Sequence, residues 1–134
     1  MEAVHDLVQT LQDEFPIDPK RIYVTGLSMG GFGTWAYAIE YSDTVAALVP
    51  VCGGGDSDRS AVLSDKPIWT FHHAGDQVVP VEMTRSIVRA LEAMDQDLQY
   101  RPVLYTEYPV GDPIHPNDHY AWVPAYQTLG MRQW

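Results

Sequence analysis

The sequence predicts an α/β domain in which a mainly parallel sheet of about four strands lies between layers of helices, a three-layer α/β/α arrangement. Apolar runs that suit strands alternate with segments whose apolar residues recur at helical spacing. Such alternation is typical of parallel sheets with right-handed crossovers. A glycine-rich turn at 26–30 also joins the first strand run directly to a helical segment. The 134 residues suit a single domain, 1–134, with one core.

The first half of the chain is expected to hold two helices and two strands. Residues 2–15 predict an amphipathic helix that packs on the sheet and ends before Pro16. A strand at 21–25 is followed by a helix from about Gly30 to Glu40. The continuously apolar run 45–52 predicts a strand buried on both faces. The inward-facing residues of the second helix are expected to be Trp35, Ala36 and Ile39.

The second half repeats the pattern after a polar loop at 53–58. We expect a strand at 66–72, a helix at 80–94, a strand at 100–108 and a closing helix at 121–131. The apolar face of the helix at 80–94 contains Met83, Ile87, Val88 and Leu91. The segment between Cys52 and Lys66 is too short for an inserted lid, so we expect an open site.

Composition excludes several classes of partner. The chain has 18 acidic and 8 basic residues, a formal net charge of −10, whereas nucleic acids and anionic membranes need a basic face. No apolar run approaches the roughly 20 residues of a membrane span. The first residues do not resemble a signal peptide, so we expect a cytoplasmic protein, although a removed secretion leader would leave no trace. The single cysteine, Cys52, excludes an internal disulfide and is interpreted as a core residue.

The turn Gly26-x-Ser28-x-Gly30 has the form of a nucleophile elbow, in which a serine stands on a sharp turn between strand and helix. We expect the two glycines to make room for the backbone, and Ser28 to adopt strained dihedral angles with its Oγ exposed. The backbone N–H of Met29, at the helix start, could then stabilise an oxyanion. The alternative is a glycine-rich turn with an incidental serine; the strand before it and the helix after it favour the elbow.

Two further residues, Asp76 and His119, also follow predicted strands. Sites in parallel sheets form beyond the carboxyl ends of the strands, so Ser28, Asp76 and His119 are expected at one edge. Hydrolysis through serine needs a base to accept the Oγ proton and an acid to orient that base. Nucleophile, acid and histidine occur in the order found in α/β-hydrolases.

Three stretches carry a resemblance to compact esterases related to polyhydroxybutyrate depolymerases, feruloyl esterases and phospholipase/carboxylesterases: 18–31, 71–80 and 119–126. The resemblance implies an α/β-hydrolase fold without the family's N-terminal strands. It also implies that Ser28 is the nucleophile, Asp76 the acid and His119 the base. His73 stands where the family usually has glycine, a departure that would crowd the turn of the acid.

Alternatives exist for two of these residues. Asp76 could be only a turn or cap residue, in which case Asp112 or Asp118 would be the acid. His115 competes with His119 as the base. The family spacing to a tryptophan and a tyrosine favours His119; these residues are Trp122 and Tyr126.

The remaining histidines and tryptophans have simpler interpretations. His72 is interpreted as a partly buried histidine that satisfies backbone groups. A metal centre at His115 and His119 is disfavoured because Pro116 interrupts a helical face and the glutamate of a zinc protease is absent from this motif. We therefore expect no metal and no cofactor. Trp35 and Trp69 are expected in the core, whereas Trp122 and Leu27 are expected to contact substrate.

The leading hypothesis is a serine carboxylesterase acting on small, short-chain esters through an acyl-enzyme. The alternatives are a feruloyl or acetyl-xylan type carbohydrate esterase, and a non-catalytic truncated hydrolase subunit. By resemblance, the second oxyanion donor comes from a loop in the family's N-terminal part, so only the Met29 donor is expected here. The strand at 21–25 would lack a partner on one side, which predicts a homodimer through this edge.

Overall fold

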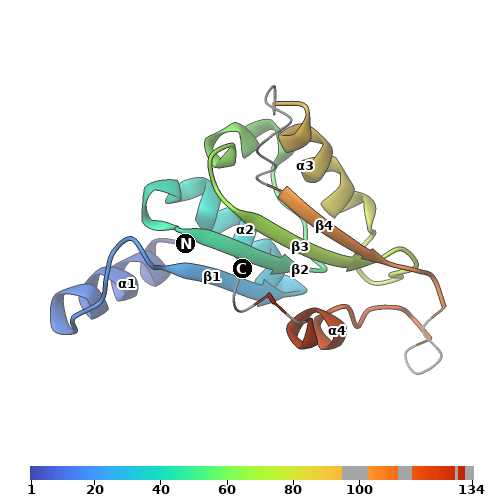
Figure 1. Cartoon of the computed structure of the whole chain (residues 1–134), viewed down its shortest axis with the longest axis horizontal. Coiled ribbons are helices and arrows are strands. Elements are labelled where there is room, and N and C mark those ends of the chain that lie inside the picture. Colours follow the sequence, from blue (N-terminus) through green and yellow to red (C-terminus); the bar gives the residue numbers. More distant parts are fainter. Residues whose placement is uncertain (95–102, 112–115, 129, 132–134) are drawn as a thin grey trace.

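The computed structural model describes residues 1–94, 103–111, 116–128 and 130–131, and it contains a four-stranded, entirely parallel sheet (Figure 1). The strands follow the chain in the order β1-β2-β3-β4. Their bounds are Tyr23–Leu27, Ala47–Val51, Ile68–His73 and Val103–Tyr108. The predicted sheet is therefore confirmed, with each strand displaced by a few residues; positions 100–102 of the predicted last strand lie outside the described residues.

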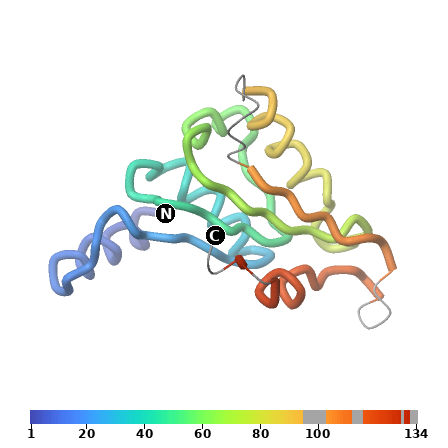
Figure 2. Tube along the Cα trace, in the orientation of Figure 1, coloured from blue at the N-terminus to red at the C-terminus, as the bar shows by residue number. Residues whose placement is uncertain are grey.

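Helices cover both faces of the sheet. The helices among the described residues are α1 (Glu2–Glu14), α2 (Met29–Glu40), α3 (Glu82–Glu92) and α4 (Trp122–Gln127), with short 3₁₀ helices η1 (Ser42–Thr44) and η2 (Ser57–Leu63). Helices α2 and α3 share one face, whereas the chain returns from β4 to place α4 on the other, as the trace in Figure 2 shows. The three-layer prediction is thus confirmed. None of the helices in the described part of the chain has the length and apolar character needed to cross a bilayer.

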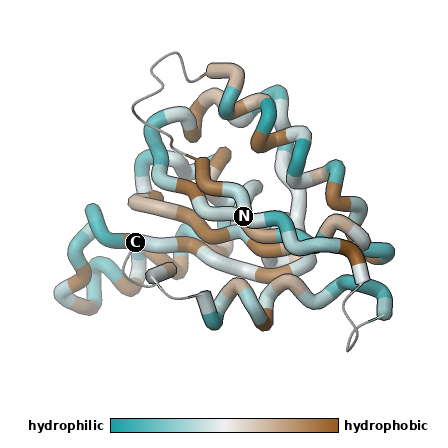
Figure 3. Tube along the Cα trace, turned by 45° about the vertical axis from the view of Figure 1, so that its right-hand side comes forward, coloured by the Kyte–Doolittle hydropathy of each residue, from teal (hydrophilic) through white to brown (hydrophobic). Residues whose placement is uncertain are grey.

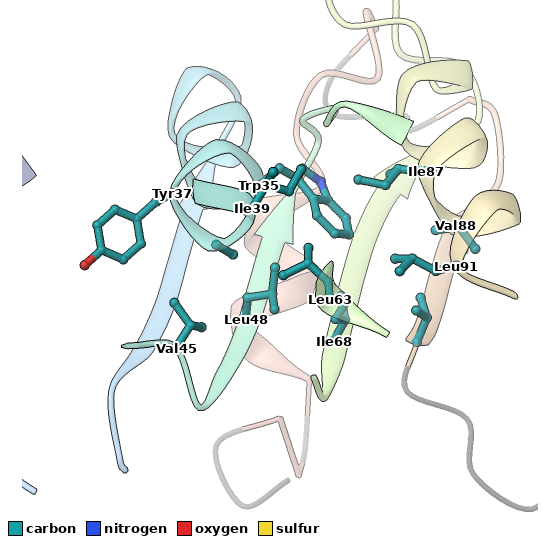
Figure 4. Close-up of a cluster of buried hydrophobic side chains, with 12 residues drawn as sticks. Trp35, Tyr37, Ile39, Val45, Leu48, Leu63, Ile68, Ile87, Val88 and Leu91 are labelled. Carbon is teal, nitrogen blue, oxygen red and sulfur yellow. The ribbon is translucent and has the colours of Figure 1, made fainter. Parts of the chain in front are cut away.

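The core forms where alternate strand residues meet the helices. Leu48 and Ile68 point toward α2 and α3, where they pack with Trp35, Ile87 and Leu91 (Figure 4). The strand residues that alternate with these, such as Val51 and Phe71, point to the opposite face of the sheet, toward α4. There they form a second cluster with Cys52, Ala121 and Ala125. Hydropathy follows these layers: hydrophobic residues concentrate along the strands in the middle of the molecule (Figure 3).

Two predicted core positions on the helices are wrong. Ala36 is exposed, because the buried face of α2 is built from Thr34, Trp35 and Ala38, and two residues turn the helix by about 200°. Met83, which the sequence places on the apolar face of the helix at 80–94, is 44% exposed, whereas Thr84 beside it is buried. The other predicted core residues of these helices are buried.

The first helix forms as predicted, but most of its apolar face does not pack on the sheet. Helix α1 lies beside the start of β1 (Figure 1), and none of its residues is buried, although Val8 is partly buried against the core cluster. Its other contacts are with α2 and the residue that follows it: the His5 ring stacks on Tyr41 at 3.9 Å, and His5 Nδ1 lies 3.2 Å from the Tyr37 hydroxyl. The apolar residues Val4, Leu7, Leu11 and Phe15 are left exposed.

Candidate active site

The turn between β1 and α2 holds Ser28 in an unusual backbone conformation. Its φ of 51° and ψ of −117° lie where residues other than glycine are strained. Two hydrogen bonds fix the turn: Ser28 N–H donates to the Val51 carbonyl at 3.0 Å, and Phe32 N–H donates to the Ser28 carbonyl at 3.1 Å. Ser28 is therefore presented at the carboxyl end of β1, where α2 begins.

The two glycines of this turn are not equivalent. A Cβ on Gly26 would lie 2.3 Å from the carbonyl oxygen of Gly30, a distance that real Cβ atoms do not adopt. A Cβ on Gly30 would meet nothing within 4 Å. The expectation that both glycines make room for the backbone therefore holds for Gly26 alone.

Three side chains from distant parts of the chain meet beyond the strand ends. His119 Nε2 lies 3.0 Å from Ser28 Oγ, and His119 Nδ1 lies 2.8 Å from Asp76 Oδ2. Because a carboxylate only accepts hydrogen bonds, Nδ1 carries the proton of a neutral ring. Nε2 is then free to accept the Ser28 hydroxyl. The Asp76 side chain is fully buried, and the His119 side chain is 13% exposed.

The carboxylate of Asp76 is held by its own turn. Its Oδ1 accepts the backbone N–H groups of Val78 and Val79, each at 2.9 Å. Asp76 N–H in turn donates to the His73 carbonyl at 3.3 Å. These bonds satisfy one carboxylate oxygen, so that Oδ2 is left to face the histidines.

His72 supports the other side of this carboxylate, a contact that the sequence interpretation missed. It is completely buried, with Nε2 at 3.0 Å from the Val79 carbonyl and 3.2 Å from Asp76 Oδ2. Both partners are acceptors, so Nε2 carries the proton. Nδ1 contacts the hydroxyl of Thr84 at 2.8 Å, which links this ring to α3. Burial lowers the pKa of His72, and the Val79 carbonyl and Asp76 oppose that shift.

The loop that carries His119 is tied to the Asp76 turn. Asp118, with a φ of 54°, is buried, and its Oδ2 accepts Gly111 N–H at 2.9 Å. The same carboxylate lies against Gly75, where a Cβ would approach Oδ2 to 2.1 Å. Asp118, one of the alternative acids, therefore braces the loop. The alternative acid Asp112 and the alternative base His115 lie outside the described residues.

The other candidate residues surround the serine and the histidine. Trp122 presents its ring edge-on to His119, with centroids 5.3 Å apart. Leu27, directly before Ser28, is 39% exposed. Met29 is the first residue of α2, so its N–H has no carbonyl partner within the helix. The ring of the buried His73 packs against that of Tyr108, with centroids 5.0 Å apart.

Cys52 is a core residue, as predicted, but it also borders this site. It is fully buried at the end of β2, and burial raises the pKa of its thiol to about 11. Among the described residues, Cys52, Asp76 and His119 each place one potential metal-ligating atom within 4.8 Å of the others.

A serine on a strand–turn–helix, a histidine and a buried carboxylate at the carboxyl edge of a parallel sheet are the arrangement of an α/β-hydrolase. The comparisons agree. A thermostable esterase of known structure superposes with a TM-score of 0.91 and 41% identity, over 98% of this chain and 35% of that protein. The chain therefore has an α/β-hydrolase fold and resembles esterases.

Two curated relatives match shorter stretches. A bifunctional acetylxylan esterase/xylanase from Neocallimastix patriciarum is 27% identical over 86 residues, which is 64% of this chain. A poly(3-hydroxyalkanoate) depolymerase C from Paucimonas lemoignei is 40% identical over 52 residues, which is 39% of this chain. Each match spans 13% of the relative's length. No family model matches the chain.

The two glycines of the serine turn provide a matched pair of variants. Gly26→Ala should destabilise the fold by about 1–3 kcal/mol, because its Cβ collides with the backbone of Gly30. Gly30→Ala should be neutral or should stabilise α2 by about 0.5–1 kcal/mol. Urea unfolding of the two variants and the parent measures both effects; equal stabilities for the two variants would contradict this account of the turn.

The buried His72 predicts a pH-dependent stability. Because the pKa of His72 is lowered in the folded protein, the unfolded chain binds a proton at this residue more readily than the folded chain does. The contribution of His72 to the free energy of unfolding is therefore complete above about pH 6.5 and is lost as the pH falls below that value. Thermal unfolding between about pH 8 and pH 5 should therefore depend less on pH in His72→Asn than in the parent. Identical pH profiles for both proteins would show that the His72 imidazole does not contribute.

Proposed function

We propose that this chain carries the catalytic residues of a serine carboxylesterase. The observation that supports the proposal most directly is the continuous hydrogen-bonded series from Ser28 Oγ through His119 to Asp76 Oδ2. In this proposal the three residues are nucleophile, base and orienting acid. The resemblance to a solved esterase at 41% identity supports the same class of reaction.

The reaction follows from the positions of the protons. His119 Nε2 removes the Ser28 hydroxyl proton as Oγ attacks the ester carbonyl, and Asp76 stabilises the resulting imidazolium. The imidazolium then protonates the leaving alcohol, and an acyl-enzyme remains on Ser28. Water, deprotonated by His119, attacks the acyl carbon and releases the acid and free Ser28.

The negative charge that develops on the carbonyl oxygen needs hydrogen-bond donors. The N–H of Met29 is one candidate, because it begins α2 next to Ser28 and adds the positive end of the helix dipole. Loss of one such donor from an oxyanion hole commonly reduces the rate by about 10²–10³-fold. The rate therefore depends on a second donor from outside this turn.

Small, short-chain esters are the proposed substrates. The segment after β2 continues into the short 3₁₀ helix η2, Ser57–Leu63, rather than into a lid. Trp122 and Leu27 are the proposed contacts for the substrate, beside His119 and Ser28 respectively. A second candidate function, removal of acetyl or feruloyl groups from carbohydrate, is favoured by the similarity to the acetylxylan esterase/xylanase.

Hydrolysis of p-nitrophenyl esters of increasing acyl length tests the proposal. Activity should be greatest with the shortest acyl chains and fall with length, and Ser28→Ala should reduce it by several orders of magnitude without a change in thermal stability. The parent, but not Ser28→Ala, should react covalently with a fluorophosphonate probe. Undiminished hydrolysis by Ser28→Ala would exclude Ser28 as the nucleophile, and an inert, unlabelled parent would indicate a non-catalytic subunit.

His119→Ala should lose as much activity as the serine variant, whereas His115→Ala should retain activity.

We also propose that the chain forms a homodimer through the edge near residues 21–25. Strand β1 is at the edge of the sheet, and Tyr23 on it is 65% exposed. Neither a proline nor a charge protects the apolar strand, and such an edge can pair with another strand. Helix α1, beside the start of β1 (Figure 1), also exposes the apolar residues Val4, Leu7 and Leu11.

Light scattering at micromolar concentration tests the assembly. A dimer should have twice the 15.1 kDa mass of the chain, and Tyr23→Lys should convert it to a monomer. Lys20→Ala, a change on the neighbouring turn, serves as the control and should leave the mass unchanged. A parent mass of one chain would contradict the dimer.

A further inference from the structure

The thiol of Cys52 lies beside the two side chains that orient each other at the candidate active site. Cys52, Asp76 and His119 each offer one ligand atom, and these atoms all lie within 4.8 Å of one another. They come from three different segments: the end of β2, the turn after β3 and the loop before α4. Sulfur, imidazole nitrogen and carboxylate oxygen are the three ligand types that Zn²⁺ binds in proteins.

The spacing is close to that of a coordination sphere. With bonds of about 2.0–2.3 Å, neighbouring ligand atoms of a tetrahedral zinc ion lie roughly 3.5 Å apart, so side-chain shifts of about 1 Å would suffice. Asp76 Oδ1 is held by the two backbone N–H groups of its turn, so a cation would bind through Oδ2 and would replace the hydrogen bond that Oδ2 accepts from His119 Nδ1 at 2.8 Å. Of the three side chains, that of His119 is 13% exposed, whereas those of Asp76 and Cys52 are buried.

We propose that Cys52, His119 and Asp76 form a binding site for a thiophilic divalent cation such as Cd²⁺ or Zn²⁺, and that its occupation blocks hydrolysis. The inhibitory part rests on the proposed function, because the cation takes the histidine that would deprotonate Ser28. The site differs from the metal centre that the sequence disfavoured, because it uses Cys52 and inhibits rather than catalyses.

Binding of the cation releases one proton, that of the Cys52 thiol. The thiol releases one proton to solvent as its sulfur bonds to the cation, so binding is stronger at higher pH. One ring nitrogen of neutral His119 binds through its lone pair and the other carries the single ring proton, which moves from Nδ1 to Nε2 where Nδ1 is the ligand. The carboxylate of Asp76 binds without a proton change, and the sulfur ligand selects soft cations over Mg²⁺ and Ca²⁺.

A titration with Cd²⁺ tests binding without reference to catalysis. The thiolate-to-cadmium charge-transfer absorption in the ultraviolet reports Cys52 alone, because the chain has one cysteine. We expect the band to appear on addition of Cd²⁺, to be reversed by a chelator and to be absent in Cys52→Ser and Cys52→Ala. In His119→Gln the affinity should fall at least tenfold. Absence of the band from the folded parent, or equal affinity in His119→Gln, would overturn the site.

Inhibition is measured on the same samples with a short-chain ester. The Cd²⁺ concentration that halves the rate should rise at least tenfold in the two Cys52 variants relative to the parent, and Ca²⁺ should not inhibit at these concentrations. Equal Cd²⁺ sensitivity of the parent and both variants would overturn the inhibitory role. If the parent hydrolyses no ester, the proposed function fails, while the absorption titration still decides whether the site exists.

Discussion

The buried carboxylate of Asp76 is the group on which the rest of the site depends. An ionised carboxylate without partners in a protein interior costs several kcal/mol, so its position is stable only where donors surround it. Two backbone N–H groups of its own turn hold Oδ1, while His119 and His72 face Oδ2. The same contacts that satisfy this charge also fix the orientation of the His119 ring toward Ser28. Stability and geometry of the site therefore have one physical origin.

This requirement extends the site well into the fold. His72 stands at the end of β3, its Nδ1 contacts the Thr84 hydroxyl on α3, and that hydroxyl oxygen lies 2.5 Å from the Gly53 carbonyl oxygen. On the other side, Asp118 braces the His119 loop against Gly75 and Gly111. Because these groups are buried, each can be satisfied only if the strand ends, α3 and the loop keep their relative positions. The site is thus a consequence of how the layers pack.

Cys52 has a structural role in the core and also lies where a bound cation would block the proposed chemistry of the site. A cysteine at the end of the central strand β2 is an apolar filler for the core beneath α4. The same place brings its sulfur within reach of the histidine and the carboxylate. A buried thiol with a raised pKa is a poor nucleophile, so this residue does not compete with Ser28 for substrate. It can still bind a soft cation, because the metal displaces the thiol proton.

The sequence by itself determined the class of fold, because the alternation of strand and helix patterns leaves few arrangements other than a parallel sheet between helices. It also predicted that Ser28, Asp76 and His119 would lie at one edge of the sheet, and the structure brings these side chains into hydrogen-bond contact. Tertiary structure alone decided the rest. Helical periodicity could not show that α1 leaves most of its apolar face exposed, because the pattern identifies an apolar stripe but not the surface that covers it. Nor could the sequence show that His72 supports Asp76, or that Cys52 borders the histidine, because those contacts join segments whose approach is fixed by strand register and layer packing.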